Sequence, residues 1–453
     1  MLDRLVRARD LVPRWLQTLG AIAAFAAVGT WLTITTWHGI KATRLDVGPL
    51  TDFRDAIYYP VVALRDGVNP YNVDAYYRNY PVGQEFPLYT PIHLLIHAPL
   101  LLFSFSTARA ISFGWNLALV LGLAATALRL AGIRLRTAAV FGLGTLILLS
   151  DPGKFDLRSG QPALMIVIAV YLAWRTSGSP GTTDTATPDS TVPLVIGAIA
   201  LAVVWSKPTY AIPLTVLLLV RNRVRVAALG TALGFTLSAL VLPSLVDAAG
   251  GMNRLVHSWQ DSARVTSRSG QSKLGSGLRI DVANTFVRIT RLHPSETVGA
   301  LGGLLLLAAG AWLVWQLRRR DPQGDREELV VALGCLLILT STYHVPYDYL
   351  LLVGPMVMLT RRGPSHAIAW PRHVRTTVTL LLLVPLVDPL GWSPINAVLG
   401  KSGFQWMLGT TMMSTYVLIA LGLCGWTAIR QLRVTATVSP VPTMSATSID
   451  GGP

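Results

Sequence analysis

The residues best suited to chemistry follow directly after the first long apolar run. The stretch 51–72, TDFRDAIYYPVVALRDGVNPYN, contains three Asp, two Arg and three Tyr. Asp52 and Asp55 are spaced by three, which places both carboxylates on one face of a helix, with Tyr59 one turn further on. A partly desolvated carboxylate within reach of a hydroxyl can act as a general base. The alternative is structural, since Thr51 can cap a helix whose first turn carries both acids.

Four further motifs combine polar and aromatic groups with proline: YTPIH, DPGKFDLRSGQP, WSKPTY and STYHVPYDY. Pro346 interrupts a helix beside His344, and a broken helix frees backbone for ligand contact. Lys207 stands directly before Pro208, where an ammonium at a helix break suits a phosphate. Two structural interpretations stay open, an interfacial histidine and a lysine that snorkels to the membrane surface.

The composition predicts a polytopic membrane protein. Of 453 residues, 52% are hydrophobic and 13% are charged, and the mean hydropathy is +0.50. Several apolar runs approach the roughly 20 residues that cross a bilayer. The run 15–37 is longer than the apolar core of a signal peptide, so we expect an uncleaved first transmembrane helix. Cys335 and Cys424 lie in apolar runs, which favours small buried side chains over a disulfide or a metal site.

The distribution of charge predicts the orientation. The net charge is +15, and much of the Lys and Arg falls in short clusters between apolar runs, which mark the cytoplasmic face. With the N-terminus inside, twelve spans place each basic cluster inside, and both termini are then cytoplasmic. We predict these spans at 15–37, 109–130, 137–150, 161–175, 191–206, 208–220, 226–246, 297–317, 328–343, 348–360, 375–391 and 406–429.

Two segments need separate treatment. The run 91–105 is short and contains two Pro and two His, so we expect a re-entrant or interfacial segment with both ends outside. The external loop 247–296 contains seven Lys or Arg and four acids, an excess that a phosphate-bearing ligand would explain. We expect one transmembrane domain over 1–433, with an amphipathic external catalytic loop at 39–108, a mobile cytoplasmic loop at 176–190 and a disordered cytoplasmic tail at 434–453.

All of the polar motifs fall on the external face in this topology, where a helical bundle would gather them into one cavity. Several polar groups together at such depth favour a site. The sequence has no Walker loop, GxGxxG turn, GxSxG or His/Cys cluster, so ATP-driven pumping and lipase chemistry have no support. Because much of the basic charge falls in short clusters between apolar runs, the net charge does not indicate nucleic acid as a partner. A secondary transporter would carry carboxylates at mid-membrane, where the predicted spans are nearly free of charge.

The order of these motifs resembles the C-type membrane glycosyltransferases, and specifically glycosyltransferase family 87, the polyprenyl-phosphate-mannose-dependent mannosyltransferases of actinobacteria. The matching pieces span residues 52–356: DF with YY and DGVNPYN, YTPIHLLIHAPLL, SGQPALM, WSKPTYAIPLTVLLLVRNR and TYHVPYDYLLLVGPM. The resemblance implies the C-type glycosyltransferase fold, all-α with about twelve transmembrane helices by our span count, and an active site on the outer face of the cell membrane.

The resemblance also implies an inverting transfer of a hexose, mannose in that family, from a polyprenyl-phosphate donor to a lipid-linked or glycan hydroxyl. The acid after the first helix is the family's general base and corresponds to Asp52, with Asp46 and Asp55 as rival acids. Lys207, Arg279 or His344 would stabilise the leaving phosphate. A monophosphate donor makes metal optional, which fits the absence of DxD, so we expect no cofactor.

The catalytic candidates are therefore Asp52 and His344. The candidates for binding donor or acceptor are Asp55, Tyr59, Tyr89, Arg158, Gln161, Lys207, Arg279 and Tyr347. The expected partners are the donor, the acceptor and membrane lipids. Three alternatives stay open: a donor that carries arabinose or glucose, a glycan ligase with a pyrophosphate-linked donor, and a transporter or flippase.

Overall fold

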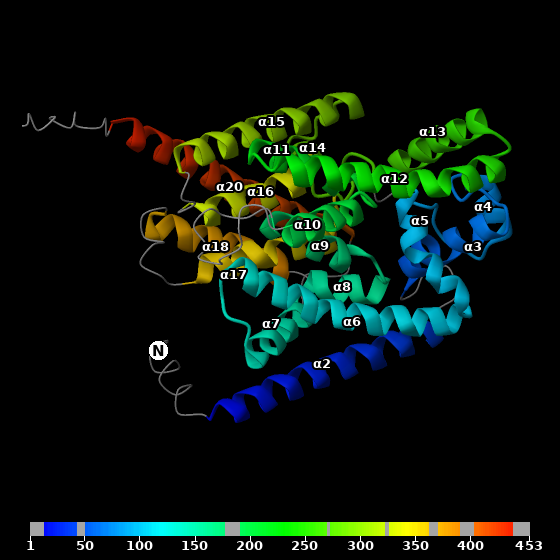
Figure 1. The fold of residues 1–453 in the computed structure, drawn as a ribbon, viewed down its shortest axis with the longest axis horizontal. Helices are drawn as coiled ribbons and strands as arrows, with labels where there is room; N and C mark the ends of the chain where they lie inside the picture. Colours follow the sequence, from blue (N-terminus) through cyan, green and yellow to red (C-terminus); the bar gives the residue numbers. More distant parts are fainter. Residues whose placement is uncertain are drawn as a thin grey trace, which may run out of the picture.

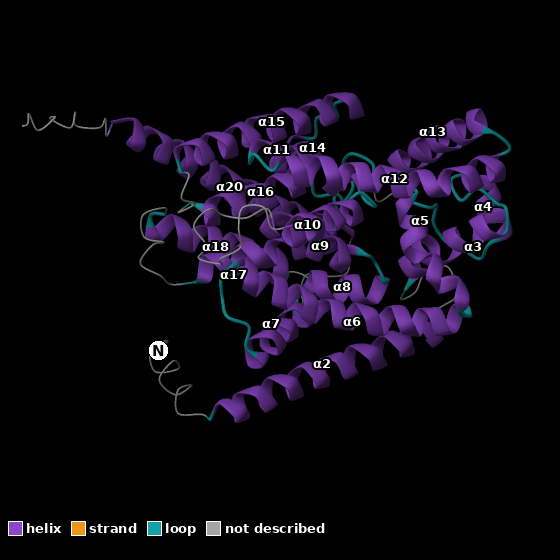
Figure 2. Cartoon of the chain, viewed as in Figure 1, coloured by secondary structure: helices purple, strands orange, loops and turns teal. Residues whose placement is uncertain are grey.

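The computed structural model describes residues 13–42, 50–176, 191–269, 272–321, 326–361, 370–389 and 403–437. Within these ranges every regular element is a helix (Figure 2). The prediction of an all-α fold is thereby confirmed for the described residues. Most of the predicted mobile loop, 177–190, and most of the predicted tail, 438–453, lie outside them.

The elements comprise α-helices, one π-helix (η1) and two 3-10 helices (η2 and η3). They follow in the order α2 (Arg14–Ala42), η1 (Phe53–Tyr58), α3 (Tyr59–Arg65), α4 (Val73–Asn79), α5 (Ile92–His97), η2 (Ala98–Leu102), α6 (Phe105–Leu130), α7 (Thr137–Leu149), α8 (Asp151–Ser159), α9 (Ala163–Thr176), α10 (Thr191–Val204), α11 (Pro208–Val220), α12 (Val224–Ala249), α13 (Met252–Arg268), α14 (Val282–Thr290), α15 (Glu296–Arg320), α16 (Glu327–Ser341), η3 (Pro346–Leu352), α17 (Val353–Thr360), α18 (Arg372–Val387) and α20 (Gly403–Thr437).

Helix α16 forms the centre of the bundle. Its residues from Glu328 to Ser341 are all buried, and it contacts α11, α15, α17, α20 and η3. Its sequence after the first turn, LVVALGCLLILTS, has no polar stripe, as expected of a helix enclosed by other helices. The outer helices behave differently, because α2, α10, α12 and α15 carry large exposed apolar side chains such as Trp31, Val195, Leu240 and Leu305. Such surfaces suit contact with lipid.

Five helices among the described residues are long and apolar enough to cross a membrane: Arg14–Gly39, Phe105–Leu130, Val224–Ala249, Glu296–Arg320 and Thr411–Arg433. The pair α8 and α9, bent by 120° at its break, raises this number to six if it counts as one span. Helices α7, α10 and α11 are apolar but shorter. A membrane protein is supported, whereas the predicted count of twelve spans is not confirmed.

Different helices gather at the two ends of the bundle (Figure 1). The first turn of α2 and the last turns of α15 and α20 lie at one end, and Arg320 donates a hydrogen bond to the carbonyl of Leu432 there. Helices α3, α4, α5 and α13 gather at the opposite end. The run 91–105 folds as α5 and η2 at this second end, where α5 contacts α12, α3 and η1. Its re-entrant nature stays a prediction.

Three breaks between helices bring polar residues into the interior. Between α10 and α11 the chain turns at Trp205–Lys207, and Lys207 takes an extended conformation, as residues before proline prefer. Helix α16 ends at Ser341, and the chain is extended at Val345 before Pro346 opens η3. The predicted interruption beside His344 is therefore present. The third break, between α8 and α9, contains Gly160 and Gln161.

Candidate active site

A close backbone approach holds the chain after α2 against the end of α8. Gly160 caps α8 in the left-handed conformation with φ 73°. A Cβ atom added to Gly160 would lie 2.6 Å from the Cβ of Phe53, so only glycine fits without displacing η1. The Leu50 N–H donates to the Arg158 carbonyl beside this contact. Asp52 is thereby placed at the turn between α8 and α9.

The carboxylate of Asp52 is partly buried and faces three polar side chains. The amide Nε2 of Gln84 donates to Oδ1 of Asp52. The side chains of Gln161 and Ser159 also lie close enough to the carboxylate to lower its pKa. Burial raises the pKa of Asp52 above its ordinary value, and these polar contacts oppose the rise only in part. A carboxylate with a raised pKa is suited to accept a proton near neutral pH.

Asp55 has a different environment although it is one helical turn away. It is 1% exposed and forms a bidentate ion pair with Arg54, with Nε–Oδ1 at 2.5 Å and Nη2–Oδ2 at 3.0 Å. The backbone N–H groups of Gly83 and Gln84 donate to its Oδ2 at 3.0 and 3.1 Å. Burial raises the pKa of Asp55 as it does that of Asp52, so the two acids differ in their partners. Because these contacts occupy the carboxylate, Asp55 fixes the loop that carries the Gln84 amide to Asp52.

Tyr89 extends the Asp52 group through Gln161. Its hydroxyl donates to Oε1 of Gln161 at 3.2 Å, which leaves the Gln161 amide nitrogen to face Asp52. The Tyr89 ring stacks on His93 with centroids 4.2 Å apart. Burial raises the pKa of Tyr89 well above its ordinary value, and the nearby carboxylates of Asp52 and Asp348 raise it further. Tyr89 is therefore close to both acids.

A second polar group forms where the breaks before α11 and η3 meet. Lys207 Nζ lies 2.9 and 3.0 Å from the two carboxylate oxygens of Asp348. Tyr210 donates its hydroxyl to Oδ1 of Asp348 at 2.9 Å. His344 Nδ1 and the Val345 N–H lie 2.9 and 3.1 Å from Oδ2. The ammonium of Lys207 also stands over the Tyr210 ring at 5.1 Å. Lys207 is therefore a buried ion-pair partner with a fixed position.

His344 makes hydrogen bonds through both ring nitrogens. Thr342 donates its hydroxyl proton to the Thr209 carbonyl at 2.8 Å, and the Thr342 hydroxyl oxygen lies 3.2 Å from His344 Nε2. His344 Nδ1 lies against the carboxylate of Asp348. The imidazole is thereby held in a fixed orientation beside the ion pair of Lys207 and Asp348.

Two residues connect the Asp52 group with the Lys207 group. The carboxylates of Asp52 and Asp348 both act electrostatically on the hydroxyl of Tyr347, and the Lys207 ammonium lies 5.2 Å from the centroid of the Tyr347 ring. Asp156 on α8 is fully buried and interacts with the charges of Asp348, Lys207 and Asp52. The two groups thus form one site.

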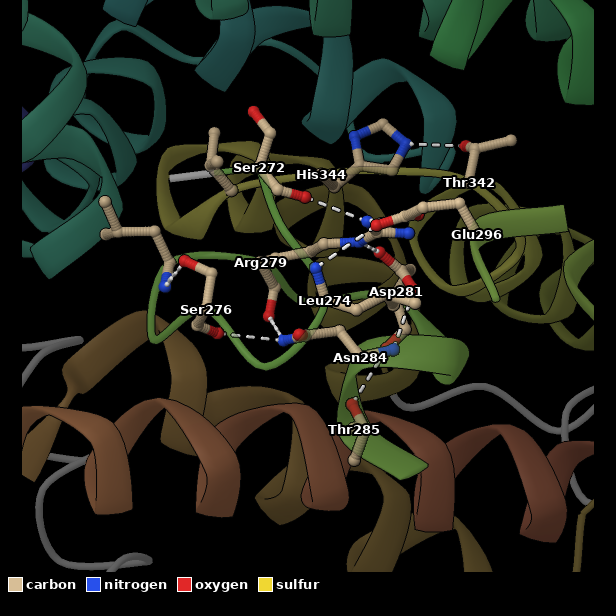
Figure 3. A network of polar contacts seen from close by, with 12 residues as sticks. Ser272, Leu274, Ser276, Arg279, Asp281, Asn284, Thr285, Glu296, Thr342 and His344 are labelled. Atoms are coloured by element: carbon tan, nitrogen blue, oxygen red, sulfur yellow. Dashed lines mark hydrogen bonds and ion pairs between the residues drawn. The ribbon is translucent and has the colours of Figure 1, made fainter. Parts of the chain in front are cut away.

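Arg279 belongs to a separate network on the loop before α14 (Figure 3). It pairs with Asp281 and, at 3.3 Å, with Glu296, and it donates to the carbonyl of Ser272 at 2.8 Å. The same loop is fastened to the site, because the Ile280 N–H donates to the His344 carbonyl at 3.0 Å. Arg279 therefore stabilises a loop that is hydrogen-bonded to the site, and its charge is balanced by two carboxylates.

Besides Arg279, two of the predicted residues lie outside this group. The ring of Tyr59 packs among Tyr58, Tyr80 and Phe105. The Arg158 side chain is exposed, and only its carbonyl contacts the Asp52 segment. The remaining candidates, Tyr89, Gln161, Lys207, His344 and Tyr347, surround Asp52 or Asp348.

Four residues of the site were not predicted from the sequence: Gln84, Asp156, Tyr210 and Asp348. Gln84 lies in a loop without a motif, and no local pattern indicates it. Tyr210 and Asp348 lie inside the motifs WSKPTY and STYHVPYDY, one to four residues from residues that were selected. Asp156 lies inside DPGKFDLRSGQP. The Ala163 N–H approaches its carboxylate, but neither oxygen makes a hydrogen bond of normal geometry. The available signal for Asp156 and Asp348 was an acidic residue inside a motif that interrupts two helices.

In the described part of the chain, no group of three or more His, Cys, Asp or Glu side chains is arranged to hold a metal ion. The expectation that the reaction needs no metal stays a prediction.

Comparison with known proteins identifies one family. The model of glycosyltransferase family 87 matches residues 87–341, which is more than half of the chain. No curated protein and no solved structure matches. The matched range includes Tyr89, Gln161 and Lys207, and it ends at the last residue of α16. Asp52 and His344 lie outside it.

Proposed function

The chain belongs to glycosyltransferase family 87, and we propose that it is an inverting hexosyltransferase that moves mannose from a polyprenyl phosphate to a lipid-linked or glycan hydroxyl. The family makes it a membrane glycosyltransferase. The observation that carries the finer proposal is that Asp52, a carboxylate of raised pKa, shares one site with the fixed ammonium of Lys207 and the fixed imidazole of His344.

Asp52 is the proposed general base. The acceptor hydroxyl loses its proton to the Asp52 carboxylate as its oxygen bonds to the anomeric carbon of the donor sugar. Gln84 and Gln161 hold the carboxylate in place with their amide groups. Attack from the side opposite the leaving group inverts the anomeric carbon, so a β-linked donor gives an α-mannoside.

The Lys207 group is the proposed binding site of the donor phosphate. The bond between the anomeric carbon and the phosphate oxygen breaks, and the electron pair stays on polyprenyl phosphate. Lys207 and His344 are positioned by Asp348 before the donor arrives, so no reorganisation is needed when the negative charge develops. The ammonium of Lys207 is the charge that we assign to the donor phosphate. Asp156 has acceptor oxygens without hydrogen bonds of normal geometry, and we assign it a hydroxyl of the donor sugar.

The location of the site also belongs to this proposal. The first turn of α2 and the last turn of α20 both lie on the left of the view, opposite the end with α3, α4 and α5 (Figure 1). Basic loops predict that the first end is cytoplasmic. We therefore place both termini inside and the site on the outer face of the cell membrane.

The experiment is transfer of radiolabelled mannose from polyprenyl-phosphate-mannose in membranes that contain the protein, with analysis of the product. Matched membranes with the Asp52→Asn variant are the control. We expect label in an α-mannoside with the wild type and little with the variant. Parallel reactions with the polyprenyl-phosphate donors of arabinose and glucose test the sugar. Transfer of either one in preference to mannose would reassign the donor, and no transfer from any of the three would contradict the proposal.

A further inference from the structure

A cavity lined by arginines lies at the end of the bundle opposite the candidate active site. It has a volume of about 530 Å³ and forms between the α11–α12 turn and the last turns of α15. Its cationic walls are Arg221, Arg223, Arg318 and Arg319. Helix α11 separates the cavity from Lys207, and its 13 residues correspond to about 20 Å at 1.5 Å per residue. The cavity is therefore a different site from the one described above.

The positive charge of this cavity exceeds the negative charge that faces it. Glu327 is the carboxylate in contact, with its Oε1 2.6 Å from Arg221 Nη2 and its Oε2 3.6 Å from Arg318 Nη1. Within the described ranges, Arg223 and Arg319 form no ion pair with a carboxylate. Four guanidinium groups and one carboxylate leave a net charge of +3.

Several donors in the cavity are also unsatisfied. Arg221 is 4% exposed, yet its Nε and Nη1 have no hydrogen-bond partner among the described residues, and neither does Nε of Arg223. Burial lowers the pKa of Arg223 to about 10, and the neighbouring Arg221 and Arg318 lower it further. Buried charged donors without acceptors are costly, so this arrangement favours a bound anion that supplies several oxygens.

The surroundings indicate that this anion is carried by a lipid. Leu219, Val220 and Trp315 add apolar walls, and Arg319 lies over the Trp315 ring at 4.8 Å. Trp315 is 37% exposed on α15, a helix whose outer face carries further exposed apolar side chains. Basic pockets between transmembrane helices bind phosphate head groups of anionic lipids. We propose that this cavity binds the phosphate of an anionic membrane lipid.

The experiment measures head-group selectivity with the full-length protein purified in detergent. The probes are dioctanoyl phosphatidylglycerol, dioctanoyl phosphatidylcholine and inorganic phosphate, and the readouts are Kd and the thermal unfolding midpoint. We expect phosphatidylglycerol to bind more tightly than the other two and to raise the midpoint. Equal binding of phosphatidylcholine would overturn the anionic selectivity. Equal binding of inorganic phosphate would overturn the lipid and leave a site for a soluble anion. This comparison needs no variant.

The position of the site is tested with two double variants. Arg223→Gln with Arg319→Gln removes two cations that pair with no carboxylate of the described ranges, and it leaves the Arg221–Glu327 pair intact. We expect phosphatidylglycerol to bind about 30-fold more weakly. The matched control removes two exposed arginines between α6 and α7, Arg134→Gln with Arg136→Gln, and should keep the wild-type Kd. Equal weakening in both double variants, or none in the first, would contradict the proposal.

Discussion

Replacing Asp52 by Asn is expected to lower turnover, and replacing Asp55 by Asn is expected to lower stability. Among the described residues Asp52 forms no ion pair and contacts amide and hydroxyl groups, whereas Asp55 is locked to Arg54 and to two backbone N–H groups. Asn keeps the size of either side chain and one acceptor oxygen but cannot take a proton. The pair of variants therefore separates catalysis from stability at two neighbouring positions.

The Asp52→Asn variant should lose turnover and keep its fold. Removal of a general base lowers kcat by about 10²- to 10⁴-fold. Unlike the turnover, the free energy of unfolding should not fall. Because burial raises the pKa of Asp52, its contribution to folding is full below the unfolded value of about 3.9 and is lost as the pH rises through the folded value. At neutral pH the variant should therefore unfold at the wild-type temperature or above it.

The Asp55→Asn variant should lose stability. Arg54 is 5% exposed and would lose its bidentate carboxylate. If the Asn oxygen keeps the loop N–H groups, its amide NH₂ faces the guanidinium. Breaking a buried pair by removing one partner costs about 3 to 5 kcal/mol. This cost exceeds the half kcal/mol or so that interaction with a helix dipole would contribute.

The assay compares both variants with the wild type in the same membranes at matched expression. Thermal midpoints give the folded amount, and initial transfer rates are divided by it. We expect a cooler midpoint only for Asp55→Asn, and a lower rate per folded molecule chiefly for Asp52→Asn. Near-normal turnover of a folded Asp52→Asn enzyme would refute the assignment. Loss of turnover confined to a well-folded Asp55→Asn would pass the role of base to Asp55.

Three further predictions follow from single contacts. Gly160→Ala should lower the free energy of unfolding by about 1 to 3 kcal/mol and lower turnover, because φ at Gly160 is 73° and the added Cβ would meet η1. Gly20→Ala on α2, where nothing lies within 4 Å of the added Cβ, should change neither the stability nor the turnover. Thermal midpoints and initial rates measure both. Lys207→Met should unfold at lower temperature because Asp348 stays buried and charged. The double variant Lys207→Met with Asp348→Asn should recover most of the lost stability. If the two stability losses are additive in the double-mutant cycle, the ion pair is not supported. Gln84→Ala should move the acidic limb of the kcat/KM profile to higher pH, since the carboxylate that it stabilises loses a donor; an unmoved limb would show that this contact is not made.

The membrane character was predictable from the sequence, and so was the position of several candidate residues at helix interruptions. Apolar runs, basic clusters and proline breaks are local patterns, and they directly predict helices, interruptions and polar turns. Asp52, His344, Lys207 and Gln161 all lie at or beside such interruptions, and the fold places them together. Lengths were less predictable. Helices α7, α10 and α11 are shorter than a full span. Their lengths could not be predicted, because apolar composition alone does not say where a buried helix ends.

The partner of each charged group was decided only by the tertiary structure. Lys207 reads as a lone ammonium in the sequence, but Asp348, 141 residues further on, neutralises it. Gln84 has no motif, yet it lies against Asp52, 32 residues before it. Asp52 and Asp55 look equivalent at a spacing of three, and one becomes a free base while the other becomes a buried ion pair. The physical reason is that desolvation and pairing depend on which distant groups share a small volume, and no local pattern contains that information.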